Sequence, residues 1–236
     1  MNELDNIKRF TWIPLPKFER AIPVHTKNAH YYKTPRGDVF PSVTTMLRKV
    51  EKPSPGLLAW RDSKGESVAN HIIHEAKENG TATHSIIEKY LNNKPLSELT
   101  LLVKGHFRQM LPLLNKIDQI YATEIPLYSY SMRLAGMADC IAKYDGISSV
   151  IDFKTSRTKK KEEWIENYFL QATAYCTMWN QLTGNKIKQI VILISSEDKT
   201  TLEDASVQKF VRNPKDYESI LSEKLEQFQK MENDKQ

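Results

Sequence analysis

The sequence predicts an α/β fold of the α+β kind, in which a mainly helical N-terminal part, residues 1–120, precedes a sheet-containing part, residues 121–236. Apolar residues recur at helical spacing over much of the first part, whereas the second part opens with alternating apolar and polar residues. A long helical segment then separates this alternating region from the apolar run IKQIVILISS. With 236 residues, the chain suits one domain made of a sheet with helices packed on it.

The N-terminal part reads as an ordered leader followed by helices. Residues 1–41 are rich in Pro, Lys and aromatic residues, and they predict short strands around a PRGD turn rather than a core. Ser42 suits the N-cap of the helical pattern VTTMLRKV. Residues 57–80 predict one or two further helices, Thr81 opens another in TATHSIIEKYL, and a last helix covers about 97–119.

The pattern changes near Tyr121, where TEIPLYSYSMRLAGMADCIAKYDGISSVIDFKT alternates like the strands of an antiparallel meander. A long helix follows at about 162–181 and contains Trp164. IKQIVILISS then predicts a buried strand, DKTTLEDA a turn into a short strand, and residues 214–232 a charged terminal helix.

The composition points weakly to an anionic partner. Lys and Arg number 34 against 29 Asp and Glu, which gives a formal net charge of +5. With two cysteines, Cys140 and Cys176, the chain cannot build a four-thiolate zinc or iron–sulfur site, and buried reduced thiols favour the cytoplasm. No apolar run approaches a membrane span, and MNELDNIKRF resembles neither a secretory nor an organellar leader, so we expect no membrane contact.

The segment KYDGIS contains the Asp-Gly pair that favours a two-residue hairpin loop. Counting outward from that loop places Asp139 opposite Asp152. Directly opposed residues hold their Cβ atoms about 4.5–5.5 Å apart, so two carboxylates there need a cation between them. Lys154 lies two residues beyond Asp152, and strand alternation puts it on the same face.

Two carboxylates and a lysine on one face are the set that metal-assisted phosphodiester hydrolysis requires. Carboxylates hold Mg²⁺, which polarises the phosphate and lowers the pKa of the attacking water. The lysine orients that water and stabilises negative charge. For D-x-K alone, a salt-bridge cluster on a solvated sheet face is the alternative interpretation, because short motifs recur by chance.

Four separated motifs resemble those of a known family, in the same order. GMADCIAKYDGISSVIDFKTS is similar to the active-site hairpin of the PD-(D/E)xK nuclease superfamily, and its GxxD and IDFKTS resemble the RecB-like branch. GTATHSIIEKYL resembles that branch's helix with its histidine, here His84, and QATAY resembles its Q-x-x-x-Y signature through Gln171 and Tyr175. PSVTTML and LLAWR are similar to the N-terminal region of the mitochondrial genome maintenance exonucleases and their phage and bacterial relatives, so the resemblance spans about 40–195.

The resemblance implies a restriction-endonuclease-like core, with a central mixed sheet flanked by helices, and a metal centre. It implies that one or two Mg²⁺ or Mn²⁺ ions are bound by His84, Asp139 and Asp152, helped by the backbone carbonyl of Phe153. Lys154 would be the catalytic lysine. Imidazole is a more usual ligand for Mn²⁺ than for Mg²⁺, so the preferred ion stays open. For His84 alone, a partly buried helix histidine is the alternative.

Four other side chains are candidates for roles around this centre. Gln171 and Tyr175 lie one helical turn apart, so both can point at the sheet face that carries the lysine, and the resemblance implies a catalytic role for them. Ordinary helix packing is the alternative for Tyr175. Glu88, one turn beyond the histidine, and Glu124, in TEIPLY, rank second as site residues.

Basic and aromatic side chains near the motifs are candidates for DNA contacts. The run TSRTKKK follows the catalytic lysine, and LLAWR adds a second group. The candidates are Arg157, Lys159, Lys160, Lys161, Trp60 and Arg61. Phosphate contacts from such a run weaken with salt, and a solvated basic loop is the alternative. No helix-turn-helix or zinc-finger spacing occurs, so sequence-specific reading of a duplex is not expected.

The leading hypothesis is a metal-dependent DNA exonuclease that prefers single strands or ends and acts in replication, recombination or repair, in bacteria or phage. Two alternatives stay open: a structure-selective or restriction-type endonuclease with the same centre, and a non-catalytic DNA-binding module on a nuclease fold. The chain has no helicase motifs and too few cysteines for the iron–sulfur cluster of some relatives. A helicase or recombination partner would therefore be a separate chain.

Overall fold

A computed structural model describes residues 8–25, 29–51, 55–96, 98–197 and 207–234. Its centre is a five-stranded sheet with the order β4-β5-β6-β7-β8. The pairs β4–β5, β5–β6 and β7–β8 are antiparallel and β6–β7 is parallel, so the predicted meander and mixed sheet are confirmed. The strands are β4 (Ile117–Ser129), β5 (Leu134–Tyr144), β6 (Ile147–Ser156), β7 (Gln189–Ser196) and β8 (Val207–Arg212).

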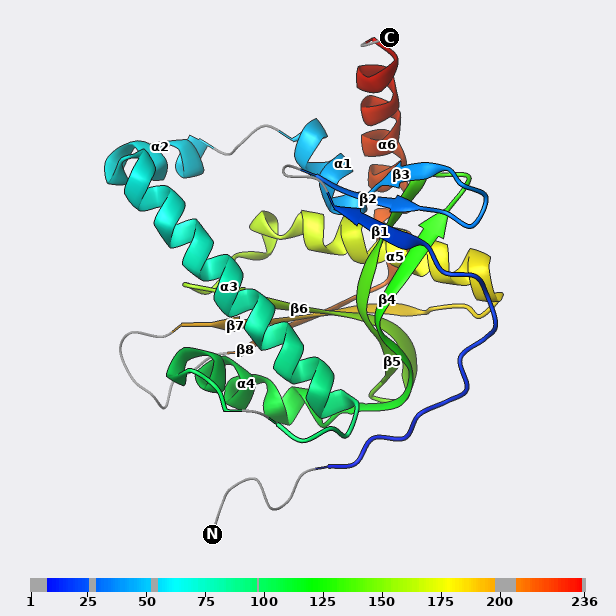
Figure 1. The fold of residues 1–236 in the computed structure, drawn as a ribbon, viewed down its shortest axis with the longest axis horizontal. Helices are drawn as coiled ribbons and strands as arrows, with labels where there is room; N and C mark the ends of the chain where they lie inside the picture. The colour runs from blue at the N-terminus through cyan, green and yellow to red at the C-terminus, as the bar shows by residue number, and fades with distance from the viewer. Residues whose placement is uncertain (1–7, 26–28, 52–54, 97, 198–206, 235–236) are drawn as a thin grey trace.

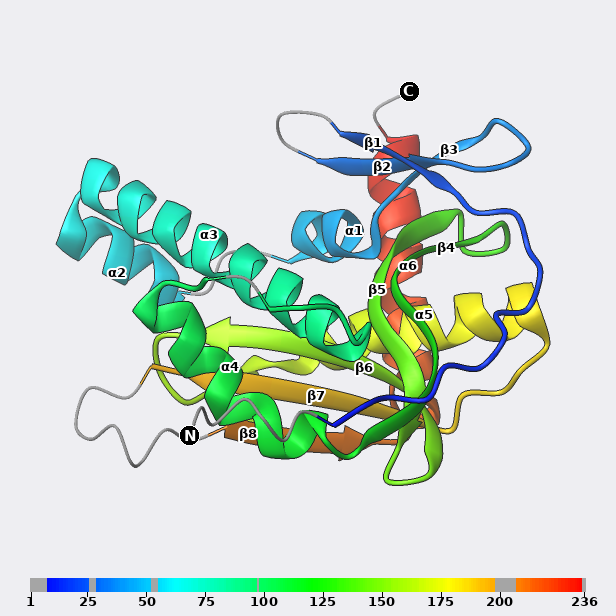
Figure 2. The same cartoon turned by 60° about the horizontal axis from the view of Figure 1, so that its bottom comes forward.

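Helices cover both faces of this sheet (Figures 1 and 2). On one face α5 and α6 share an apolar core with Ile192 of β7, and on the other α3 and α4 share a second core with Leu193. All of β7 is buried, as its apolar sequence predicts for a strand covered on both sides. These helices are α3 (Glu66–Leu91), α4 (Leu101–Leu114), α5 (Glu166–Thr183) and α6 (Glu218–Asn233).

The segment before α1 forms a small three-stranded sheet. Gly37 has φ +92° and makes the predicted turn between two of its strands, and Ser42 caps α1 by accepting a hydrogen bond from the Thr45 N–H (3.0 Å). The expectation that residues 1–41 hold no core is wrong for the part that the structure describes, because Tyr32 and Phe40 are buried against the large sheet. The elements are β1 (Ile22–His25), β2 (His30–Lys33), β3 (Val39–Pro41) and α1 (Val43–Val50).

The helix start predicted at Thr81 is wrong, because α3 runs unbroken through it. The Thr81 hydroxyl donates a hydrogen bond to the Lys77 carbonyl one turn back (3.0 Å) instead of capping a new helix. Gly80 is also helical, and a Cβ there would lie 3.3 Å from Thr155 Oγ1 of β6, so this glycine allows a close helix–strand approach. The outer half of α3 projects from the body together with α2 (Pro55–Lys64) (Figure 1).

Other predicted boundaries shift by a few residues. The helix expected over 97–119 is α4, which Thr100 caps and which ends before Asn115; residue 97 lies outside the described part. Short 3₁₀ turns precede α5 and α6, at η1 (Glu162–Trp164) and η2 (Pro214–Tyr217). The predicted turn DKTTLEDA lies outside the described residues. Among those described, no helix has the length and hydropathy that a membrane span requires.

A buried polar network joins α4 to β7. His106 Nδ1 lies 2.7 Å from Ser195 Oγ, and that hydroxyl donates its hydrogen to Gln109 Oε1 (2.6 Å). Because a hydroxyl has one hydrogen, the imidazole N–H must be the donor in the first bond. Burial lowers the pKa of His106 from its ordinary 6.5, and the Glu197 carboxylate offsets part of that shift. The network therefore holds a neutral histidine.

The network predicts a loss of stability in acid. Below about pH 6.5 the unfolded chain binds a proton that folded His106 does not, so the free energy of unfolding should fall as the pH falls, by at most ~1.4 kcal/mol per pH unit. His106→Asn keeps an N–H donor but does not titrate, so it should lose less stability between about pH 7 and about pH 5. Denaturant titrations of both proteins measure the difference, and equal losses would contradict a neutral buried His106.

The α5 helix packs directly on β5 at Gly136. A Cβ on Gly136 would lie 2.7 Å from Tyr175 Cε1 and 2.8 Å from its hydroxyl oxygen. Since Tyr175 is itself buried, it has little room to move away. The glycine therefore sets how closely α5 approaches the sheet.

Gly136→Ala should destabilise the protein by about 1–3 kcal/mol, because the added methyl overpacks this contact. Gly105→Ala is the matched control, since a Cβ at that site in α4 meets no atom within 4 Å. In a helix interior the same exchange should stabilise by about 0.5–1 kcal/mol. Thermal unfolding of both variants checks that the two changes in stability have opposite signs. A Gly136→Ala variant as stable as the wild type would contradict the tight contact.

Candidate active site

The β5–β6 hairpin carries the two candidate aspartates and the candidate lysine. Asp145 and Gly146 have φ +48° and +82°, as a two-residue type I′ turn requires, and the register counted from this turn is confirmed as far as the Cys140–Ile151 pair. The ladder ends there.

Beyond the end of the ladder, the Phe153 N–H donates a hydrogen bond to Asp139 Oδ2 (2.9 Å). The Asp139 carboxylate thus accepts the hydrogen bond that a backbone carbonyl of β5 would accept in a regular ladder. The prediction that Asp139 and Asp152 form a direct cross-strand pair is therefore wrong. In the structure the backbone of Phe153 contacts Asp139 through its N–H group. That the Phe153 carbonyl binds a metal ion remains a prediction.

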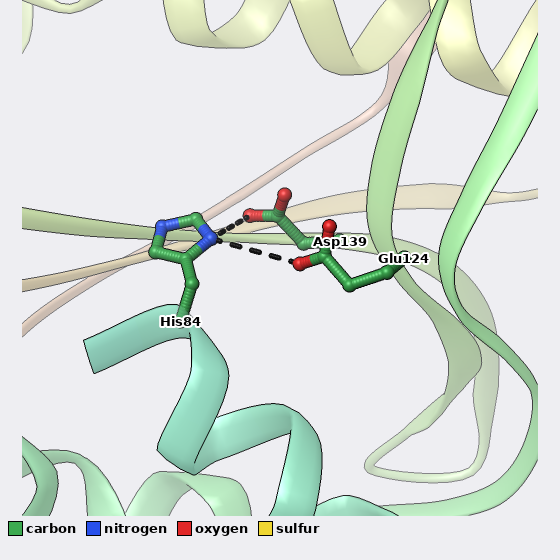
Figure 3. A group of neighbouring side chains, drawn as sticks. All are labelled: His84, Glu124 and Asp139. Carbon is green, nitrogen blue, oxygen red and sulfur yellow. Dashed lines mark ion pairs between the residues drawn. The ribbon is translucent and has the colours of Figure 1, made fainter. Parts of the chain in front are cut away.

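His84, Glu124 and Asp139 converge from α3, β4 and β5 (Figure 3). His84 Nδ1 lies 3.6 Å from Asp139 Oδ2 and 3.9 Å from Glu124 Oε1. One possible ligand atom of each residue lies within 4.8 Å of the others, and no other such group of three occurs among the described residues. Glu124, ranked second from the sequence, thus joins this cluster, whereas Asp152 does not.

Glu124 reaches the cluster from an irregular point in β4. The flanking pairs Thr123–Cys140 and Ile125–Ala138 make Asp139 its neighbour across the two strands. Its φ of +44° is a left-handed conformation that is uncommon for a residue other than glycine. Regular alternation does not predict such a conformation, so the sequence gives little sign that this carboxylate meets the histidine.

The cluster attracts positive charge. Burial acts to lower the pKa of His84, but Asp139 and Glu124 outweigh it and raise the pKa to about 9. Two carboxylates that stabilise a cationic imidazole this strongly also favour other cations at the same place.

Asp152 and Lys154 form a buried ion pair next to this cluster. Lys154 Nζ lies 2.6 Å from Asp152 Oδ2, and the aspartate side chain is 1% exposed. Burial raises the pKa of Asp152, and Lys154 offsets part of that rise. Asp152 Oδ1 is buried and has no hydrogen-bond partner in the described part of the chain. Such burial rules out the alternative of a solvated surface salt bridge.

Tyr168 of α5 lies against the lysine, with Lys154 Nζ 5.2 Å from its ring centroid. Burial acts to lower the pKa of Lys154, but Asp152 and Asp139 outweigh it, so the pKa is raised and the ammonium keeps its charge. Tyr168 was not among the candidates from the sequence. Its place three residues before Gln171, on the same face of α5, is the signal that would have found it.

Gln171 and Tyr175 both lie on the face of α5 that covers the sheet. Gln171 Nε2 donates a hydrogen bond to the Tyr175 hydroxyl (3.2 Å), and both side chains are buried. Burial raises the pKa of Tyr175 well above its ordinary value. The two residues thus form part of the wall behind Lys154, and the hydrogen bond described for Gln171 goes to Tyr175 rather than to the lysine.

A cavity of about 400 Å³ opens over the cluster between α3 and β4. Its lining includes Gly80, Thr81, His84, Ser85, Glu88 and Glu124. Glu88 therefore faces the same cavity as His84 but stands outside the group of ligand atoms. The lining thus contains two carboxylates, those of Glu88 and Glu124.

The candidate DNA-binding residues lie in two places. Arg157, Lys159 and Lys161 are exposed on the loop after β6 and Lys160 is half-buried there, whereas Trp60 and Arg61 are half-buried on α2. Three of their side chains have ion-pair or hydrogen-bond partners nearby: Arg157 Nε lies 3.9 Å from Glu197, Lys161 Nζ lies 3.9 Å from Glu163, and Arg61 donates a hydrogen bond to Asn70 (2.9 Å). Both groups lie on the side of the molecule where α2 and α3 project (Figure 2).

Comparison with known proteins gives two kinds of match. The profile of the PD-(D/E)XK nuclease superfamily matches residues 57–236. The chain is 27% identical over 187 residues to the human protein Mitochondrial genome maintenance exonuclease 1, covering 73% of this chain and 54% of that protein. The mouse protein of the same name is 28% identical over 148 residues, which is 57% of this chain and 43% of the relative.

A further relative is an ATP-dependent helicase/nuclease protein of Clostridium botulinum, 27% identical over 119 residues, or 43% of this chain and 10% of that protein. The chain spans about half the length of the exonuclease relatives that it matches. The family profile covers most of the chain, and the mixed sheet flanked by helices has the restriction-endonuclease-like arrangement expected of that family. The chain therefore belongs to the PD-(D/E)XK nuclease superfamily.

Proposed function

We propose that this chain is a divalent-metal-dependent deoxyribonuclease that works as an exonuclease on single strands or DNA ends. The observation that carries the proposal is the His84–Glu124–Asp139 cluster beside a buried Asp152–Lys154 pair, in a chain of a nuclease superfamily. This arrangement combines oxygen and nitrogen ligands with a fixed ammonium group, and phosphodiester hydrolysis needs both.

The donor set fits a hard divalent cation. Carboxylate oxygens suit Mg²⁺ and Mn²⁺, and the imidazole favours Mn²⁺. Asp152 Oδ1, which is buried and has no hydrogen-bond partner among the described residues, is a further candidate oxygen ligand. When bound, the ion would polarise the phosphate and lower the pKa of the attacking water. The residues that would hold it are His84, Glu124 and Asp139, with Asp152 and the Phe153 carbonyl as further candidates.

Lys154 supplies the fixed positive charge of the proposed reaction. Its ammonium stabilises negative charge on the phosphate as the bond breaks, and its hydrogens orient the attacking water. Asp152 and the Tyr168 ring hold the lysine in one position, and pre-positioned charge is worth more than mobile charge. Tyr175, which accepts a hydrogen bond from Gln171, supports this role through its close packing against Gly136 of β5, which fixes α5 on the sheet.

Exonuclease action rests on two observations. Two relatives carry the word exonuclease in their names, and α3, whose outer half projects together with α2 (Figure 1), lines the cavity over the cluster. A strand that enters beneath these helices by its end would reach the cluster. An endonuclease with the same centre would have to accept a strand that has no ends, so a closed circular substrate distinguishes the two activities.

The biological setting is part of the proposal. DNA replication, recombination or repair, in a bacterial or phage-infected cytoplasm, suits a DNA exonuclease whose two described cysteines are buried free thiols. A separate helicase chain as partner is supported by the helicase/nuclease relative alone. The chain from residue 1 to 236 would act as one nuclease domain.

Asp139→Asn should abolish metal-dependent cleavage of DNA, by about 100-fold or more, because it removes a charge from the cluster but keeps an oxygen for the Phe153 N–H. Mn²⁺ should raise the melting temperature of the wild type and much less that of the variant. Release of labelled nucleotides, with and without EDTA, measures the activity.

The matched control is Asp145→Asn, the same exchange on the same hairpin, at a turn position that asparagine also favours. It should leave both activity and Mn²⁺ stabilisation unchanged. Full activity of Asp139→Asn would refute the proposed centre. A wild type without hydrolysis in Mg²⁺ or Mn²⁺ would instead favour a non-catalytic DNA-binding module.

The wild type should degrade linear single-stranded DNA and leave a covalently closed single-stranded circle intact, because an exonuclease needs an end. Gel electrophoresis of both substrates over time, with Mg²⁺ or Mn²⁺, makes the comparison. After one nick by an unrelated endonuclease, the circle should be degraded as fast as the linear strand. Rapid loss of the closed circle would establish the endonuclease alternative.

A further inference from the structure

We propose that Trp164, with the basic loop before it, is a platform on which an unpaired base of a single-stranded DNA substrate stacks. We call residues 157–164 the β6–α5 loop. This inference rests on the proposed nuclease function and deepens it, since it assigns a place to a base rather than to the reacting phosphate.

Trp164 is the first observation. Trp164 is 60% exposed, more than any other described Phe, Tyr or Trp, whereas the next residue, Ile165, is fully buried. The sequence predicted Trp164 inside a long helix, but it lies in the 3₁₀ turn η1 that precedes α5. A ligand that covers this large flat apolar surface would gain the free energy of removing it from water.

The platform is held in place rather than loose. Gln208 of β8 makes two hydrogen bonds to the backbone of Lys160, accepting from its N–H (2.7 Å) and donating to its carbonyl (2.8 Å). Arg212 forms an ion pair with Glu162 in η1 itself. Since the loop is fixed at both places, the protein loses little further conformational entropy when a ligand stacks on Trp164.

The charge of the loop favours an anionic partner. Four basic and two acidic side chains lie between Arg157 and Trp164. Both acids face cations, since Glu162 pairs with Arg212 and Glu163 lies 3.9 Å from Lys161. Lys161 Nζ is also 5.2 Å from the centroid of the Trp164 ring. An aromatic face with adjacent lysines is the arrangement that holds single-stranded nucleic acids, by base stacking and phosphate contacts together.

The platform is close to the proposed centre along the chain. Trp164 precedes Tyr168 by four residues, so their Cα atoms are at most about 14 Å apart. The Tyr168 ring in turn contacts the Lys154 ammonium. Both cartoon views place the C-terminal end of β6, where this loop begins, below the projecting half of α3 (Figures 1 and 2). A strand whose phosphate meets Lys154 therefore has a nearby nucleotide within reach of Trp164.

The partner is a single strand rather than a duplex. Inside a duplex both faces of a base are covered by its neighbours, so a protein ring can stack only on an unpaired or terminal base. The loop does not form a regular helix or strand that would enter a groove.

The test compares binding of fluorescein-labelled oligothymidylate with binding of a strand of the same length made of abasic sites, both in EDTA. Trp164→Ala should weaken binding of oligothymidylate about fivefold or more and leave binding of the abasic strand unchanged, because the lost contact is to a base. Trp164→Phe keeps a ring and should stay within about twofold of the wild type. In cleavage assays Trp164→Ala should raise KM and leave kcat unchanged, as expected for a contact away from the reacting atoms.

Trp12→Ala is the matched control, since Trp12 is 38% exposed but lies in the N-terminal segment beside β4. It should bind both strands as the wild type does. The stacking platform would be refuted if Trp164→Ala bound oligothymidylate as tightly as the wild type, or if it lost as much affinity for the abasic strand as for oligothymidylate. In either case, cleavage of DNA by the wild type would still support the nuclease function. A wild type that neither binds nor cleaves single-stranded DNA would overturn both.

Discussion

A carboxylate buried in the middle of the sheet is the constraint on which the site depends. Asp152 lies on β6 between two other strands and beneath α5, so water cannot compensate its charge. Strand alternation brings Lys154 to the same face, and the ion pair makes this burial tolerable. One oxygen of the carboxylate still lacks a partner among the described residues. The same pair thus stabilises the fold and leaves an unsatisfied negative group at the edge of the cluster, where a cation is favourable.

The other proposed metal ligands come from elements far apart in the sequence. His84 belongs to the helical N-terminal part, Glu124 to the first strand of the large sheet and Asp139 to the second. A division near residue 120 is therefore useful for describing the sequence but cuts through the site. The close approach of α3 to β6 at Gly80 and Thr155 is what brings the histidine within 3.6 Å of Asp139. The packing of two helices against one sheet is thus a condition of the chemistry.

Local rules predicted the hairpin well, because a two-residue Asp-Gly loop fixes the register of both strands and therefore the shared face of Asp152 and Lys154. They failed where the backbone leaves regular geometry or a tertiary contact decides. The β5–β6 ladder ends one pair before the predicted Asp139–Asp152 pair, and the left-handed Glu124 turns a second-ranked residue into a member of the cluster. The threonine after Gly80 looked like a helix start, whereas α3 runs through it and the Thr81 hydroxyl bonds to the Lys77 carbonyl. Alternation and helical period carry no information on such contacts.

The two halves of α3 have different physical roles. Beyond Thr83 toward its C-terminal end, the buried side chains Ile86, Ile87, Tyr90 and Leu91 anchor it, whereas the outer half buries Ala69 alone and α2 buries none of its described residues. Four apolar side chains on this outer part are exposed: Leu57, Leu58, Val68 and Ile73. A segment with so little burial moves at low cost in free energy. His84 lies just inside the anchored half, so a movement of the outer helices would leave the histidine in place. The position of the proposed ligand His84 and the freedom of the outer helices to move therefore depend on separate parts of one helix.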